Sequence, residues 1–462
     1  MFVLLSQVCW PGGAQADTSA EDIFSKQNET ALVMKVEAAI AAAQADYGVI
    51  PRAAADEIAE KADTAHATQE DLAAEYGIVR HRMVALLNVW RRSLSPEAGD
   101  ALHHGVTTVD IYDTVMVLQL LDTIDVLLAD MSAQEEAMLC LAAQYRDTPM
   151  MGRTLGQHAL PITFGKKVSV WAAQNRRNMD RLYEVRARLR TSGLLKGAVG
   201  THLGLGDHGA EIEKRVADYL GLDTPEPADW RPARDVFAEY AQVLALIAKS
   251  NAAIGGEVFR LQETDIGELA EVRTATAVGS STMPQKVNPN LSEGLIYYGR
   301  TIPALAGVLL EDVESVFERD NTSRPNTTLA DISIEAADMV ADSAKLIGRL
   351  HVYPDRMRAN MDATGGLIMS QRVVLFLGER MSREEAELRV RDIAAASLAS
   401  GASFRDALLA DELVGPRLNG HIDTLLDPAT YLGLSAGQVD RTAAWIGQKR
   451  AERGEPVPAA CR

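Results

Sequence analysis

The sequence has few aromatic residues and no long apolar run. Phe, Trp and Tyr make up 5% of the 462 residues, whereas alanine is abundant, for example from Ala38 to Ala43 and from Ala394 to Ala399. This composition favours helices over sheets. No apolar stretch approaches the roughly 20 residues that span a bilayer, so we expect no membrane partner.

Cysteine is scarce, and histidine does not occur in a metal-binding pattern. The three cysteines, Cys9, Cys140 and Cys461, are too few and too scattered for a disulfide framework, which favours a reducing compartment, the cytoplasm. None of the nine histidines has H-E-x-x-H spacing. We therefore expect neither a metal nor another cofactor.

Positive charge is also in short supply. The 46 Lys and Arg residues face 64 Asp and Glu residues, which gives a net charge of -18. Such a chain repels nucleic acid, so an anionic substrate needs a local positive site. Residues 1–17 contain the apolar stretch F-V-L-L-S-Q-V-C-W and the tripeptide A-Q-A, as signal peptides do. They lack a basic segment, so we predict a cytosolic arm.

The length and the spacing of Gly and Pro predict an all-α protein with three parts. An N-terminal helical domain covers 1–110, a central elongated bundle of long helices covers 111–350, and a C-terminal helical domain covers 351–462. The expected helices cover 23–62 (two helices joined at 47–51), 71–92, 110–145, 161–190, 227–262, 289–318 and 325–350.

The stretch Gly279–Pro289, G-S-S-T-M-P-Q-K-V-N-P, is typical of a catalytic loop. Gly279 widens the accessible backbone angles, and two prolines prevent a helix from running through the segment. Ser280 and Ser281 supply hydroxyls, while Lys286 and Asn288 supply a cation and an amide. Together they can hold a carboxylate and remove a neighbouring proton, as β-elimination requires.

This stretch resembles the signature loop of the fumarase/aspartase superfamily, in particular its adenylosuccinate lyase and 3-carboxy-cis,cis-muconate cycloisomerase branch. Two further stretches are similar to motifs of the same superfamily. They are H-H-G-V-T-T-V-D-I-Y-D-T, from His103 to Thr114, and G-R-T-L-G-Q-H-A-L-P-I-T-F-G-K, from Gly152 to Lys166.

The positions of these two stretches predict an oligomer. One lies at the start of the long helix from Asp110 and the other follows its end, about 50 Å away. A shared site therefore requires several copies of the chain, most simply a homotetramer with D2 symmetry. The resemblance implies the same, since superfamily members are homotetramers whose sites draw on three subunits. Several helix N-termini would then surround the anion.

The resemblance implies roles for individual residues. Ser280 is the base, and Ser281, Lys286 and Asn288 bind the substrate, a small dicarboxylate. Thr107 and Thr108 bind a substrate carboxylate. The remaining substrate-binding residues are Arg153, Thr154, Gln157 and His103. From the residues alone, the threonines could equally cap helices, Arg153 could form a structural ion pair, and His104 could take the place of His103.

Three departures from the family pattern narrow the function. Leu155 replaces a histidine that supports leaving-group protonation in fumarases and adenylosuccinate lyases, and His158 is a substitute acid or a structural histidine. Val109 replaces an asparagine of fumarases. Gln285 and Val287 replace His and Arg of cycloisomerases.

These features predict a lyase that cleaves a C–N or C–O bond of a substituted succinate to give fumarate. The sequence does not choose the leaving group, and nitro-, amino- and sulfur-substituted succinates are all open. The alternatives are a 3-carboxy-cis,cis-muconate cycloisomerase and a catalytically silent structural homologue.

Overall fold

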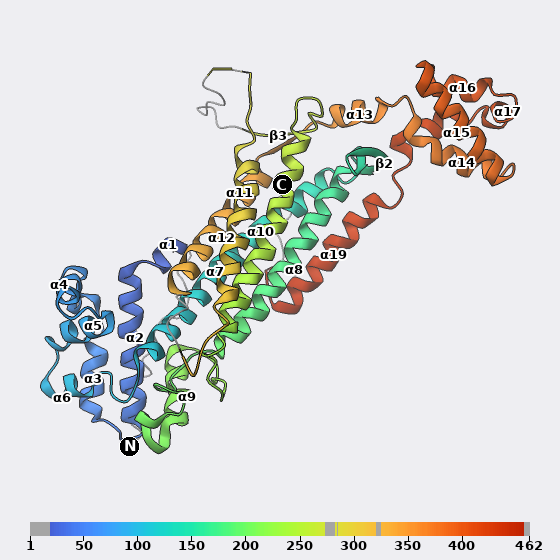
Figure 1. Cartoon of the computed structure of the whole chain (residues 1–462). Helices are drawn as coiled ribbons and strands as arrows, with labels where there is room; N and C mark the ends of the chain where they lie inside the picture. The colour runs from blue at the N-terminus through green and yellow to red at the C-terminus, as the bar shows by residue number, and fades with distance from the viewer. Residues whose placement is uncertain (1–18, 273–281, 284, 320–324, 457–462) are drawn as a thin grey trace. The chain divides into compact units, whose positions relative to one another are not determined.

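The computed structural model describes residues 19–272, 282–283, 285–319 and 325–456. Helices dominate these residues, and the strands are few and short, so the predicted all-α class is confirmed (Figure 1). The chain forms two compact units. Unit 1 contains residues 1–131, 178–249 and 297–341, and unit 2 contains residues 132–177, 250–296 and 342–462. The proposed three-part division stays a prediction.

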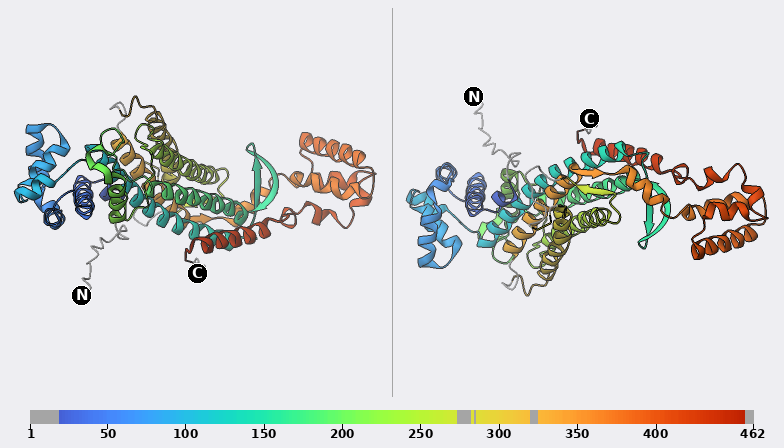
Figure 2. Two further views of the ribbon diagram at one scale, coloured as in Figure 1. Left: turned by 90° about the horizontal axis from the view of Figure 1, so that it is seen from below. Right: turned by 90° about the horizontal axis from the view of Figure 1, so that it is seen from above.

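Five long helices contribute residues to the units, and within each unit their segments pack side by side (Figure 2). The predicted helices are present, but two of their starts were wrong. Pro161 lies inside a strand rather than at a helix start, and α10 begins eight residues after Pro227. The long helices are α7 (Thr108–Gln144), α8 (Phe164–Arg190), α10 (Asp235–Leu261), α11 (Asn290–Glu311) and α12 (Pro325–Gly348).

Unit 1 begins with short helices that pack around α2. The helix predicted for 71–92 is two helices, because Arg80 adopts a left-handed conformation with φ 54° and ends the first one. His81 then begins the second, since its Nδ1 accepts from the backbone N–H of Val84. The helices are α1 (Ala20–Ile23), α2 (Lys26–Asp46), α3 (Arg52–Glu60), α4 (Gln69–Val79), α5 (Arg82–Arg91), α6 (Pro96–Ala101) and, later in the chain, α9 (Gly209–Leu220).

Unit 2 contains a β-hairpin that the helical pattern did not predict. Strand β1 (Pro149–Thr154) pairs antiparallel with β2 (Gln157–Thr163) through a two-residue turn. Both turn residues have positive φ, 52° at Leu155 and 78° at Gly156, as a type I′ turn requires. A second small sheet pairs β3 (Leu269–Glu271) with β4 (Leu350–Val352).

The last part of the chain forms short helices around their own apolar core, which includes Val373, Leu377, Phe404 and Leu418. The helices around this core are α14 (Ser370–Gly378), α15 (Arg383–Ser400), α16 (Phe404–Ala410), α17 (Gly415–Leu418) and α18 (Ile422–Leu426). Helix α13 (Pro354–Asp362) precedes them in the chain, and α19 (Ser435–Arg453) follows them.

Buried ion pairs fix α19 within unit 2. The carboxylate of Glu135 in α7 accepts from Nε of Arg176 in α8 at 2.8 Å and from Nε of Arg450 in α19 at 2.7 Å. All three side chains are at most 1% exposed. Removing any one of them would leave buried charge uncompensated, so these contacts hold the helices in one arrangement.

One global expectation can be compared with the described residues. Among the helices that the structure describes, none combines the length and the apolar character needed to cross a membrane.

Candidate active site

The predicted catalytic serines lie outside the described residues. Gly279, Ser280 and Ser281 are not among them, whereas the second half of the stretch, including Lys286 and Asn288, is. This half leads directly into α11, where the N–H of Asn290 donates to the carbonyl of Asn288 at 3.1 Å. The cation and amide predicted to bind carboxylate thus lie next to a helix N-terminus.

Two residues that sequence reasoning missed hold the two ends of this stretch. Glu271, before it, accepts from the N–H groups of Leu291 and Ser292 at 3.0 and 2.8 Å and from the Ser292 hydroxyl at 2.6 Å. Gln262 of α10 accepts from the N–H of Glu271 at 2.8 Å and donates to the carbonyl of Val287 at 3.3 Å. The base of the loop is therefore tied by side chains on both sides.

Thr107 and Thr108 lie at the start of α7. The N–H of Thr107 donates to the Asp110 carboxylate at 3.0 Å, and the same carboxylate accepts from the N–H groups of Lys196 and Gly197. Burial raises the pKa of Asp110, while these N–H donors and the charge of Arg231 act in the opposite direction. Both threonines are half-buried, and their hydroxyls have no hydrogen-bond partner among the described residues, so they remain available to a ligand.

His103 forms a pair with a buried carboxylate. Its Nδ1 lies 2.6 Å from Oε1 of Glu37, a residue of α2 that is completely buried. The other carboxylate oxygen of Glu37 has no partner in the described part of the chain. Gln44 fixes the neighbouring turn by donating to the carbonyl of His104 at 2.7 Å. Of the two histidines, His103 is thus the one with a fixed ring.

Gly105 in the same turn cannot be replaced without a shift of backbone. Its φ is 70°, and a Cβ atom there would lie 2.1 Å from the carbonyl oxygen of Gly204. The segment 103–107 is therefore packed backbone to backbone against the loop around Gly204, which fixes the position of the two threonines that follow.

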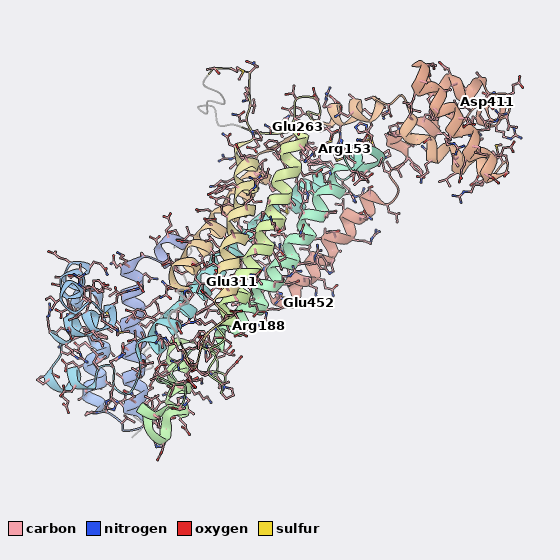
Figure 3. The ribbon with its side chains drawn as sticks, viewed as in Figure 1. Arg153, Arg188, Glu263, Glu311, Asp411 and Glu452 are labelled. Carbon is pink, nitrogen blue, oxygen red and sulfur yellow. The ribbon has the colours of Figure 1, made fainter. Side chains whose placement is uncertain are left out.

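The hairpin carries the residues of the second motif. Arg153, which is labelled in Figure 3, donates through both terminal nitrogens to Glu268, at 3.0 and 2.7 Å. This buried carboxylate also accepts from Asn360 at 2.8 Å. Arg153 thus forms the structural ion pair that the sequence allowed as an alternative to substrate binding. Thr154 and Gln157 are exposed and face each other across the turn. They are placed where a ligand could reach them.

His158 and Leu155 provide little proton-donating capacity. His158 lies opposite Arg153 in the hairpin. Its pKa is lowered, first by burial and then by the positive charge of Arg153, so its imidazole is mostly neutral at pH 7. Leu155, at the turn, is fully exposed and cannot donate a proton.

Side chains already occupy the N-termini of three helices beside the motifs. Asp110 accepts from the start of α7, the hydroxyl of Thr163 accepts from Lys166 at the start of α8, and Glu271 accepts from the start of α11. These side chains take up one or two of the N–H donors at or just before each helix start, so the expected contribution of helix N-termini to anion binding stays a prediction.

The three motifs are divided between the two units of the chain. The first belongs to unit 1, and the second and third belong to unit 2. Helix α7 connects the first motif to the second, and its 37 residues span about 55 Å. Among the described residues, no group of three or more His, Cys, Asp or Glu side chains is arranged to hold a metal ion.

The chain matches known families over most of its length. Residues 13–303 match a family model described as lyase, and residues 366–442 match one described as adenylosuccinate lyase C-terminus. It is 34% identical to the N-acetyl-S-(2-succino)cysteine lyase of Dickeya dadantii (strain 3937), over 90% of this chain and 92% of that protein.

Two further similarities support the same family assignment. The chain is 33% identical to the adenylosuccinate lyase of Methanocaldococcus jannaschii, over 93% of this chain and 94% of that protein. The crystal structure of 3-carboxy-cis,cis-muconate lactonizing enzyme from Pseudomonas putida superposes with a TM-score of 0.87 at 30% identity, covering 93% of this chain and 97% of that one.

Proposed function

Because this chain belongs to the fumarase/aspartase superfamily of lyases, we propose that it eliminates the substituent of a substituted succinate and releases fumarate. Ser280 removes the proton from the carbon beside one carboxylate. Lys286 and the loop N–H groups stabilise the negative charge that develops there, while Asn288, Thr107 and Thr108 hold the carboxylates. The electron pair then forms the double bond as the substituent leaves.

The leaving group departs as an anion of low basicity. The observation that carries this proposal is Leu155, an exposed side chain without a transferable proton. The neighbouring His158 has a lowered pKa, so at neutral pH most of it carries no proton to donate. A nitrogen substituent can leave only when it carries an additional proton, whereas a thiol, with a pKa of about 8.5, can leave as a thiolate without one. A sulfur substituent therefore fits best, and the similarity to N-acetyl-S-(2-succino)cysteine lyase supports this class.

The site is assembled from several copies of the chain in the cytoplasm. Because α7 separates the first and second motifs by about 55 Å, the two motifs of one copy cannot contact the same substrate molecule. A homotetramer with D2 symmetry places the ends of antiparallel copies side by side. Three copies then contribute to each site.

A cycloisomerase is the second candidate. Its reaction uses the same carbon acid chemistry and is compatible with a site that lacks a proton donor at residue 155, and the similarity to the lactonizing enzyme supports it. Gln285 and Val287 weigh against it, because they replace the His and Arg of the cycloisomerase loop.

The test is a spectroscopic substrate screen with purified protein. Fumarate absorbs at about 240 nm, so its release can be followed from S-succinylated N-acetylcysteine, from an amino-substituted succinate and, as consumption, from 3-carboxy-cis,cis-muconate. We expect fumarate from the thioether and much less from the amine. Consumption of carboxymuconate alone would establish the cycloisomerase. Inactivity toward all three compounds would indicate a catalytically silent structural homologue.

A further inference from the structure

A basic cavity lies between α8 and α19, within unit 2 and outside the residues assigned to catalysis. The two helices run next to each other (Figure 1), and the cavity between them has a volume of about 520 Å³. Its charged lining residues are Lys166 and Arg177 on α8 and Arg441 on α19. Lys166 ends the second sequence motif, but the proposed reaction gives it no role.

The charge of this lining is of one sign, although the chain as a whole carries -18. Two other cavities in the described structure have linings that carry both signs of charge. In one of them Arg82 is paired with Glu29, and in another Arg383 is paired with Glu387. No carboxylate lines the cavity between α8 and α19, so its positive potential is not neutralised from within.

Neighbouring basic residues have acidic partners, but two of the lining cations do not. Lys167, next to Lys166, pairs with Glu257, and Arg146 pairs with Asp440, next to Arg441. Lys166 and Arg441 themselves form no ion pair within the described residues. The hydrogen bonds from Arg146 lower the pKa of Asp440, and the charge of Arg441 acts in the same direction without forming an ion pair with it.

The walls of the cavity are fixed and chemically mixed. The buried contacts of Glu135 with Arg176 and Arg450 hold α8 and α19 in place. Trp445 supplies an aromatic surface, and Gln438 and Thr442 supply polar groups that can donate hydrogen bonds. The cavity therefore offers two or three cations beside an apolar wall, on helices that are already held together before a ligand binds.

We propose that this cavity binds a multivalent oxyanion, carried by a small organic phosphate or by a polycarboxylate. Lys166 and Arg441 make charge-assisted hydrogen bonds to the oxyanion, and Trp445 packs against the organic portion. The site is separate from the proposed active site. Its occupancy does not depend on whether Ser280 is the base.

Isothermal titration calorimetry of the full chain tests this proposal with pyrophosphate and citrate as separate probes. We expect saturable binding of at least one probe, and the probe that binds identifies the class of ligand. The variants Lys166→Gln and Arg441→Gln should each weaken binding about tenfold, as expected for the loss of one charged hydrogen bond.

The matched control is Lys167→Gln, which removes the same charge from the adjacent position of α8 but not from the cavity. It should bind like the unmodified protein. Circular dichroism and thermal unfolding establish that each variant is folded. The proposal is overturned if neither probe binds saturably, or if the control weakens binding as much as the two cavity variants.

Discussion

Leu155 is an unusual residue for its position. Its backbone has φ 52°, a left-handed conformation that costs a residue with a Cβ about 1 to 2 kcal/mol and that asparagine tolerates better. Its side chain is fully exposed and contributes no packing within its own chain. The turn is therefore kept in a strained form by a residue that does not stabilise it.

Leu155→Asn should consequently stabilise the protein by about 0.5 to 1 kcal/mol. The expected result is a higher midpoint of thermal unfolding with no loss of activity on the thioether substrate. Leu155→Ala is the control, because it removes the side chain but keeps the backbone strain. A lower midpoint for both variants would mean that a partner subunit covers Leu155 in the assembled protein.

His158 supports a prediction about pH. Because its pKa is lowered below the usual value of about 6.5, the imidazolium forms only in acidic solution. His158→Gln should therefore leave kcat/KM unchanged at neutral and alkaline pH. A pH profile from about 5.5 to 8.5 provides the measurement. A large loss of activity at neutral pH would identify His158 as a catalytic group.

The same lowered pKa affects stability. The unfolded chain binds a proton at His158 more readily than the folded chain does, so the folded state is favoured above pH 6.5 or so and loses this advantage as the pH falls through the lowered pKa. Relative to the unmodified protein, His158→Gln should gain stability in acid. Thermal unfolding at two pH values measures the difference.

At the scale of elements, the start of α11 depends on a residue that precedes the loop. Glu271 satisfies two N–H groups of the first turn and the hydroxyl of Ser292, which is completely buried. Glu271→Ala should destabilise unit 2 by about 2 kcal/mol, the combined cost of a lost cap and of buried unsatisfied groups.

The measurement is thermal unfolding together with steady-state kinetics. Glu271→Gln keeps an acceptor oxygen and should recover most of the stability. Because Glu271 positions the segment that carries Lys286 and Asn288, we expect kcat to fall along with stability in the alanine variant. Full activity in a destabilised Glu271→Ala protein would show that the loop does not depend on this contact.

The sequence predicted the long helices because their extent follows from local composition and from proline and glycine at their ends. It did not predict the hairpin, whose turn is Leu155–Gly156 rather than the usual Asn–Gly, and whose Pro161 resembles a helix start. The sequence also did not predict two contacts between side chains, for another reason. These contacts are the hydrogen bonds of Glu271 with Ser292 and of Glu37 with His103. Their partners are 21 and 66 residues apart, so no local pattern connects them.

At the scale of the whole molecule, a shared active site predicts complementation between inactive variants. Ser280→Ala should lower kcat by at least about a thousandfold while light scattering still finds a tetramer. A Thr107→Val, Thr108→Val double variant should also be inactive, since it lacks the hydroxyls that hold a carboxylate. Mixed and reassembled, the two proteins should regain part of the activity, because some sites then receive intact residues from different copies.

Each variant reassembled with itself serves as the control and should stay inactive. Failure of the mixture to gain activity, although mixed tetramers have formed, would place all three motifs of one site in a single copy. A monomer in solution would exclude the shared site.

The hairpin tip has an evolutionary consequence. One base change can convert a leucine codon into a histidine codon, and at residue 155 the exchange disturbs no packed neighbour in the same chain. Under the proposed mechanism, this single exchange would place a proton donor at the hairpin tip. It would therefore change which leaving groups the protein accepts without repacking the surrounding residues of its own chain.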